Sequence, residues 1–260
     1  MRNRWIDPIF AMVTVLACAP LMLAQTARPS GAPNARSAVP EPDLSGVWVN
    51  ITEPSQTFNA KVEPSFQPWA EAKYKANKND NPGDTNTNGR VDQDPTIASC
   101  FPPGIPRLLT DLLPFEIVQV PGRVLLLFER DYAVSHIWTD GRKLPEDPDP
   151  TYMGYSIGKW EGDTLVIETI GLKDITWIDR VGHPHSDALH VVERMRRPSH
   201  DRLEIDWTFD DPKAFTKPWS GKSMYRYKPD WILEEYISCE DRLVHGGESL
   251  EQKAVKGNAK

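Results

Sequence analysis

Between residues 115 and 239 the chain is a succession of short segments in which apolar and polar residues alternate, separated by turn-forming residues. In one of them Leu189, Val191 and Met195 share one face, whereas His190 lies on the other. Alternation with a period of two is the pattern of a half-buried β-strand. Helix-like spacing is rare between these segments. The pattern therefore predicts antiparallel strands joined by short turns.

The alternation predicts about ten strands in all. Their ranges are 46–51, 115–120, 123–130, 132–139, 155–160, 164–170, 189–196, 203–209, 223–227 and 232–239. One or two short helices are expected, at 65–76 and near 107–113. Ten antiparallel strands can close into a barrel, which leaves no unpaired edge. We therefore expect an all-β antiparallel barrel, wide enough to hold one small ligand.

The segment LSGVW at 44–48 resembles the Gly-x-Trp motif that opens the first strand of lipocalins and related calycin barrels. The resemblance implies a lipocalin-like barrel in which Trp48 plugs one end beneath an arginine from late in the chain. Arg226 and Arg242 are the candidates for that arginine.

Longer segments resemble an uncharacterised family of secreted bacterial proteins. These segments are PGRVLLLFE at 121–129, MGYSIGKWEGDTLVIET at 153–169 and GHPHSDAL at 182–189. This second resemblance implies export and a single domain, and it leaves the ligand or reaction open.

The amino terminus has the layout of a secretory signal, because Arg2 and Arg4 precede an apolar run that ends at Leu23. The run is shorter than the roughly 20 residues of a spanning helix, so we expect no transmembrane anchor after cleavage. With cleavage after Ala24, the protein is expected to be periplasmic or secreted. A lipoprotein with lipid on Cys18 is the alternative.

Four parts are expected along the chain. They are a signal peptide (1–24), a flexible tether (25–42), a single β-barrel domain (43–245) with a loop insert at 77–98, and a flexible tail (246–260). The net charge of -7 leaves no basic patch for phosphate contacts, so nucleic acid is not an expected partner. The sequence has no Gly-x-Ser-x-Gly motif, phosphate-binding glycine loop or dinucleotide fingerprint. Common hydrolase and nucleotide-enzyme classes are thereby excluded.

Two cysteines remain after cleavage, Cys100 and Cys239. In an oxidising compartment they can form one disulfide that closes a long loop. The alternative is two separate buried thiols.

A polar loop from Asp179 to Asp187 separates two apolar segments and contains His183 and His185. In an extended backbone both imidazoles point the same way, which suits two ligands of Zn, Fe or Mn, with Asp187, Asp179 or Glu193 as a third. Without a metal, either histidine paired with Asp179 or Asp187 can act as a general acid or base. The remaining interpretation is that these side chains hydrogen-bond the backbone of a long connection.

Four further residues are candidate ligand contacts at the interior or mouth of the barrel: Arg142, Tyr155, Glu168 and Trp177. Glu168 would need a partner if it faced inward, because a buried lone carboxylate is costly. Facing outward it would be an ordinary solvated residue. The aromatic candidates can equally be core residues.

Residues 84–92 match the first nine positions of a calcium loop, with an oxygen ligand at every second position and a glycine at the turn. The candidate ligands are Asp84, Asn86, Asn88 and Asp92. Pro95 stands where an EF-hand has its bidentate glutamate. The alternatives are a structural calcium site that stabilises the insert and a turn-rich loop without metal.

Together these features predict an exported barrel that binds a small, largely apolar molecule in its cavity. One alternative is a lyase or isomerase in which His183 or His185 works with Asp179 or Asp187. A second is a metal-dependent hydrolase that uses the histidine pair. Calcium in the 84–92 loop and a transition metal at the histidines are the two possible cofactors, and neither is required by the sequence.

Overall fold

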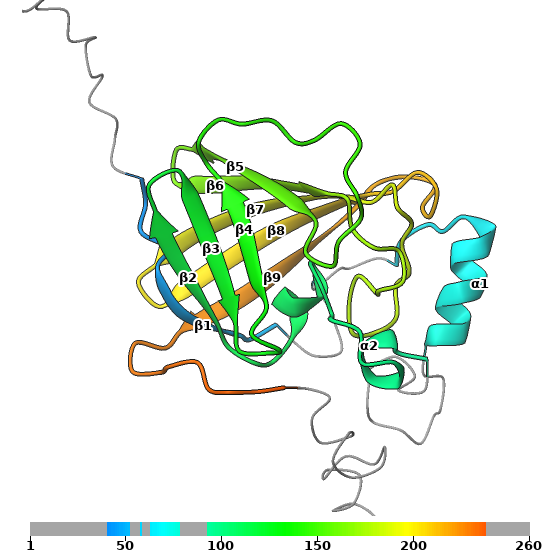
Figure 1. Ribbon diagram of the computed structural model, residues 1–260, viewed down its shortest axis with the longest axis horizontal. Helices are drawn as coiled ribbons and strands as arrows, with labels where there is room; N and C mark the ends of the chain where they lie inside the picture. Colours follow the sequence, from blue (N-terminus) through cyan, green and yellow to red (C-terminus); the bar gives the residue numbers. More distant parts are fainter. Residues whose placement is uncertain (1–40, 53–57, 59–62, 79–92, 238–260) are drawn as a thin grey trace, which may run out of the picture. The chain divides into compact units, whose positions relative to one another are not determined.

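The computed structural model describes residues 41–52, 58, 63–78 and 93–237 (Figure 1). Within these residues nine strands form one closed barrel in sequence order, and the first strand pairs with the last. The expected all-β barrel with short helices is therefore confirmed.

The strands follow the expected alternation closely. They are β1 (Gly46–Asn50), β2 (Phe115–Val120), β3 (Arg123–Phe128), β4 (Val134–Trp138), β5 (Tyr155–Glu161), β6 (Thr164–Ile170), β7 (His190–Ser199), β8 (Arg202–Asp210) and β9 (Trp219–Tyr227). The prediction of a tenth strand at 232–239 is wrong for residues 232–237, the part of it that the structure describes. Tyr236 forms only an isolated bridge there. The pairing of β1 with β9 already closes the barrel, so no free edge remains for another strand.

The helical segments are short. They are α1 (Pro68–Asn77), α2 (Pro95–Ala98) and the 3-10 helix η2 (Arg107–Thr110). α1 starts with a proline at its first position, which suits a helix start, and it buries Ala70 and Tyr74 one turn apart. α2 lies inside the region expected to be a loop insert, and Asp94 caps it by accepting from the Thr96 N–H. In the part of the chain covered by the model, no helix combines the length and apolarity needed to cross a membrane.

One strand pair differs from the expected antiparallel pattern. β4 and β5 run parallel, with Ile137 opposite Ser156 and Trp138 opposite Ile157. A closed barrel with an odd number of strands needs such a pair, because strict alternation of direction closes only with an even number. The connection over residues 139–154 therefore returns along the length of the barrel before β5 begins (Figure 1).

The two ends of the barrel carry different connections. At one, which we call the short-turn end, two-residue turns join β2 to β3, β5 to β6 and β7 to β8. At the other, the long-loop end, lie the segments between β1 and β2, β6 and β7, and β8 and β9. α1 and α2 lie at the long-loop end, on the right and lower right of Figure 1. Because loops carry binding groups more often than strands do, the long-loop end is the expected position of a functional site.

Trp48 of β1 lies beneath an arginine side chain. It is fully buried, and its indole N–H donates to the Leu44 carbonyl at 2.9 Å. The arginine above it is Arg197 of β7, whose guanidinium lies 5.0 Å from the Trp48 ring centroid and 4.8 Å from that of Tyr227. Arg226 therefore does not fill the expected position, and Arg242 lies outside the described residues.

Candidate functional site

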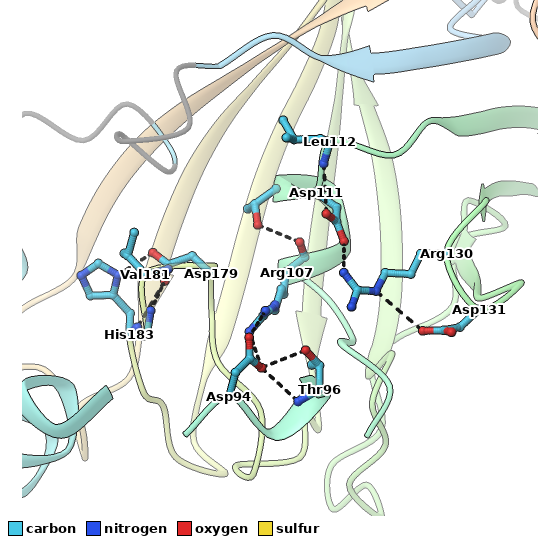
Figure 2. Close-up of polar contacts among 12 residues, drawn as sticks. Asp94, Thr96, Arg107, Asp111, Leu112, Arg130, Asp131, Asp179, Val181 and His183 are labelled. Carbon is cyan, nitrogen blue, oxygen red and sulfur yellow. Dashed lines mark hydrogen bonds and ion pairs between the residues drawn. The ribbon is translucent and has the colours of Figure 1, made fainter. Parts of the chain in front are cut away.

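His183 lies at the long-loop end between two carboxylates. Its Nδ1 is 2.5 Å from Asp179 Oδ2 (Figure 2), and its Nε2 is 3.2 Å from Glu63 Oε2. Burial opposes a charge on the ring, but the two carboxylates outweigh it and raise the pKa of His183 to about 9. At neutral pH the ring is therefore an imidazolium that donates both N–H groups to the protein.

Asp179 also organises the backbone of the loop. Its Oδ1 accepts the backbone N–H groups of Val181, Gly182 and His183 at 3.1, 3.1 and 3.2 Å. One carboxylate thus holds both the turn and the charged imidazole. The interpretation that the polar side chains of this loop bond its own backbone accounts for these contacts.

His185 is buried in a separate environment. Its Nδ1 lies 2.9 Å from the Ser186 carbonyl oxygen and its Nε2 lies 3.1 Å from Thr176 Oγ1. Because a carbonyl only accepts, Nδ1 carries the proton, and Nε2 can accept from the threonine hydroxyl. Burial lowers the pKa of His185, which keeps the ring neutral. Both ring nitrogens of both histidines are thus occupied by protein groups.

The histidine pair does not form the core of a metal site in this arrangement. The two imidazoles contact different partners, and Asp187 lies at the surface, where it forms an ion pair with Lys213 at 2.6 Å. Across residues 41–52, 58, 63–78 and 93–237, no group of three or more His, Cys, Asp or Glu side chains could hold a metal ion.

Three candidate ligand contacts lie on the outside of the barrel. Arg142 is exposed and stacks on Trp138, with its guanidinium carbon 3.5 Å from the ring centroid. Glu168 lies 3.2 Å from His190 Nε2, with 46% of its side chain exposed. Tyr155 alternates with the inward-facing Ser156 and is 36% exposed. None of the three can therefore contribute to a site inside the barrel.

Trp177 is buried at the long-loop end, where the guanidinium of Arg107 lies 5.4 Å from its ring centroid. Arg107 is itself buried, and both of its terminal nitrogens bind the carboxylate of Asp94 (Figure 2). Arg130 forms a similar pair with Asp111 at 2.5 Å, also drawn in Figure 2. Burial would raise the pKa of Asp111, but the Arg130 guanidinium outweighs it and lowers that pKa.

A third arginine, Arg180, belongs to the same charged cluster. Burial lowers the pKa of its half-buried guanidinium, and the charges that act on it most are Asp111, Arg107, Arg130 and Asp94. The carboxylates of Asp94 and Asp111 are already paired with Arg107 and Arg130. No hydrogen bond or ion pair is formed by the Arg180 side chain with any described residue. We refer to Arg107, Arg130 and Arg180 as the arginine cluster.

Glu193 is the most unusual group inside the barrel. It is 2% exposed, and it occupies the same face of β7 as the fully buried Val191 and Met195. Its neighbours across the sheet are Ile167 on β6 and Trp207 on β8. Its Oε2 has no hydrogen-bond partner. Burial raises the pKa of Glu193 to about 8, so the carboxyl group is mostly protonated at neutral pH.

The buried position of Glu193 and the arginine cluster were not predicted from the sequence, for different reasons. The metal hypothesis includes Glu193 only as a third ligand, although the alternation through Val191 and Met195 places it on the inward face. The arginine cluster has no local signal, since its members come from η2, the turn between β3 and β4, and the loop after β6.

Several predicted residues lie outside the described part of the chain. They are Asp84, Asn86, Asn88 and Asp92 of the calcium loop, Cys18 and Cys239. Cys100 is described and exposed, and its disulfide with Cys239 stays a prediction. No protein-family model matches the chain, and no curated protein is similar to it in sequence, so the geometry of its residues carries the functional argument.

Proposed function

We propose that this protein is exported to the periplasm or the medium and that its barrel binds a small, largely apolar molecule, with Glu193 as the polar group that recognises it. Export rests on the signal-like residues 1–24. Binding rests on one observation, the buried carboxyl group of Glu193 without a hydrogen-bond partner for Oε2.

The surroundings of Glu193 support an apolar ligand. The nearest side chains on the neighbouring strands are Ile167 and Trp207, both about 1% exposed. Ligand-binding barrels typically combine an apolar interior with a few placed polar groups. An unsatisfied buried polar atom costs about 1 to 3 kcal/mol, so a barrel that keeps one gains stability when a ligand supplies the missing hydrogen bond.

The protonation state of Glu193 narrows the ligand class. A protonated carboxyl group donates one hydrogen bond and accepts others, so it suits a hydroxyl or neutral amine. A permanently charged ligand would lose its hydration in the apolar interior. The proposed ligand is therefore a small neutral molecule with one polar group.

Binding is favoured over acid–base catalysis at the histidine pair. His183 has a carboxylate at each ring nitrogen, and His185 has a carbonyl and a hydroxyl. A general acid or base must reach the substrate directly or through one water molecule. In this arrangement neither ring presents a nitrogen to a substrate.

The test uses N-phenyl-1-naphthylamine, a neutral fluorescent amine, titrated into the full secreted protein. We expect saturable fluorescence, and we expect cyclohexanol to displace the probe better than methylcyclohexane does. The Glu193→Leu variant should bind the probe but lose the preference for the alcohol. Glu168→Leu, at a partly exposed site outside the barrel, is the matched control and should keep it.

Two outcomes would overturn the proposal. One is the absence of saturable probe binding by the wild-type protein. The other is an equal preference for the alcohol in wild type and Glu193→Leu. Export is tested separately, by N-terminal sequencing of protein from the periplasm or medium, which should begin at Gln25. An intact Met1 in all fractions would refute it.

A further inference from the structure

We propose that the outer face of β2, β3 and β4 is the interface of a homodimer, in which two copies of the barrel pack face to face. This surface lies on the outside of the barrel, so the proposal does not depend on a ligand at Glu193.

The three strands place nine side chains on this face in three rows. Outward positions alternate with buried ones along each strand, and the registers of β2 with β3 and of β3 with β4 set the outward positions side by side. The first row is Glu116, Leu127 and Val134, the second is Val118, Leu125 and His136, and the third is Val120, Arg123 and Trp138. We call these nine residues the outer patch.

The outer patch is mainly apolar, although it lies on the outside of the barrel. Six of its nine residues are valine, leucine or tryptophan. Val120 in the third row and Val134 in the first are 38% and 37% exposed. In Figure 1 the three strands form the near wall of the barrel, and no described segment is drawn in front of it. A contiguous apolar patch on the surface of a soluble protein marks an interaction site.

The opposite side of the barrel shows the contrast. On the outer face of β7, β8 and β9, Arg194 pairs with Glu161, and Glu204 pairs with both Arg196 and Lys222. Such ion pairs are typical of a solvated sheet face. The apolar character of the outer patch is therefore particular to β2, β3 and β4.

The charges at the two ends of the outer patch favour a second copy of the chain as its partner. Neither Glu116 in the first row nor Arg123 in the third forms an ion pair with any described residue. The guanidinium of Arg123 lies instead 5.2 Å from the Trp138 ring centroid and 3.5 Å from His136 Nδ1. The outer patch thus carries an unpaired negative charge at one end and an unpaired positive charge at the other.

A two-fold axis across the strands makes this arrangement complementary to itself. Such an axis sets the first row of one copy against the third row of the other, so that Glu116 of each copy comes within reach of Arg123 of the second copy. The middle rows, with Leu125 at their centre, then pack against each other. A symmetric dimer requires a self-complementary surface of this kind, and sheets pack face to face about 10 Å apart.

The first experiment measures the mass of the full protein in solution by sedimentation equilibrium over a range of concentrations. We expect the wild type to have twice the mass of one chain. Leu125→Glu places a carboxylate at the centre of the interface and should weaken association by about 100-fold or more. Val166→Glu is the matched control, because Val166 is an outward residue of β6 that lies between Lys159 and Arg194. It should dimerise as the wild type does.

The second experiment exchanges the charges at the ends of the outer patch. Glu116→Arg and Arg123→Glu should each weaken association by about tenfold, because like charges then meet at both ends of the interface. The double variant brings opposite charges together again and should dimerise more tightly than either single variant. A monomeric wild type, an undiminished dimer in Leu125→Glu, or a double variant no tighter than the single ones would each overturn the proposal. Probe binding by the Leu125→Glu monomer should equal that of the wild type, so this proposal and that for Glu193 fail independently.

Discussion

The imidazole of His183 lies flat against the phenol ring of Tyr74, with 4.5 Å between the ring centroids and 11° between the ring planes. Glu63 accepts hydrogen bonds from both, at 3.2 Å from the Tyr74 hydroxyl and 3.2 Å from His183 Nε2. Tyr74 comes from α1 and His183 from the loop between β6 and β7. The charged imidazole thus joins the helix to the loop that carries Arg180.

This contact predicts a loss of stability in mild alkali. The folded protein keeps a proton on His183 up to a pKa of about 9, whereas the unfolded chain releases it near 6.5. The contribution is fully present below pH 6.5 and falls by about 3 kcal/mol as the pH rises to 9. Urea unfolding of wild type and His183→Gln at pH 6, 7.5 and 9 measures it. The difference in the free energy of unfolding between wild type and His183→Gln should become smaller as the pH rises. A difference that stays constant with pH would contradict the prediction. His190→Gln, a histidine at the barrel surface, is the control.

Glu193 predicts a second dependence on pH, in a lower window. Burial raises its pKa to about 8 in the folded protein, so the folded state binds a proton that the unfolded chain loses near 4.5. The free energy of unfolding should fall by about 5 kcal/mol between pH 4.5 and 8 from this group. Glu193→Gln should lack that fall and gain stability relative to wild type as the pH rises. If the free energy of unfolding of wild type and Glu193→Gln changed in parallel with pH, the prediction would be wrong. Glu168→Gln is the control and should show the same pH dependence as the wild type.

The buried pair of Arg107 and Asp94 predicts an asymmetry between single and double variants. Asp94→Ala leaves a buried guanidinium without its carboxylate, which should lower the free energy of unfolding by about 3 to 5 kcal/mol. Asp94→Ala combined with Arg107→Met removes the stranded charge and should recover most of that loss. Urea unfolding at one pH measures both. A double variant as unstable as the single one would show that the charge is not the cause.

Arg197 predicts a smaller effect at the short-turn end. Its guanidinium covers Trp48 and Tyr227 and donates to the Asp43 and His200 carbonyls. Arg197→Ala should cost about 1 to 2 kcal/mol and shift the tryptophan fluorescence to longer wavelength as water reaches Trp48. The surface variant Arg194→Ala should cost less than about 1 kcal/mol. An unchanged emission spectrum in Arg197→Ala would contradict this role.

The hairpins were predictable because their determinants are local. The Glu161-Gly162-Asp163 turn and the alternation on both sides of it specify β5 and β6 within a few residues. The parallel contact of β4 with β5 was not predictable in this way. It depends on where residues 139–154 return along the barrel, and neither strand contains a signal for the direction of its neighbour.

The candidate site was predictable only in part. The hydrogen bond of His183 with Asp179 lies within one loop and follows from their spacing. The pairs of Arg107 with Asp94 and Arg130 with Asp111 depend on how separate segments meet at the long-loop end. The position of Arg197 over Trp48 was not predictable from the lipocalin resemblance, which implies an arginine nearer the end of the chain.

The parallel contact also has a consequence for the order of folding. β2 to β4 and β5 to β9 are two series of neighbouring antiparallel strands, each able to pair with strands close in sequence. Joining them requires the β4–β5 contact across residues 139–154 and the closure through β1, and both bring together distant parts of the chain. Since the entropy of loop closure must be overcome before such contacts form, we expect the two series to form first and barrel closure to limit the folding rate.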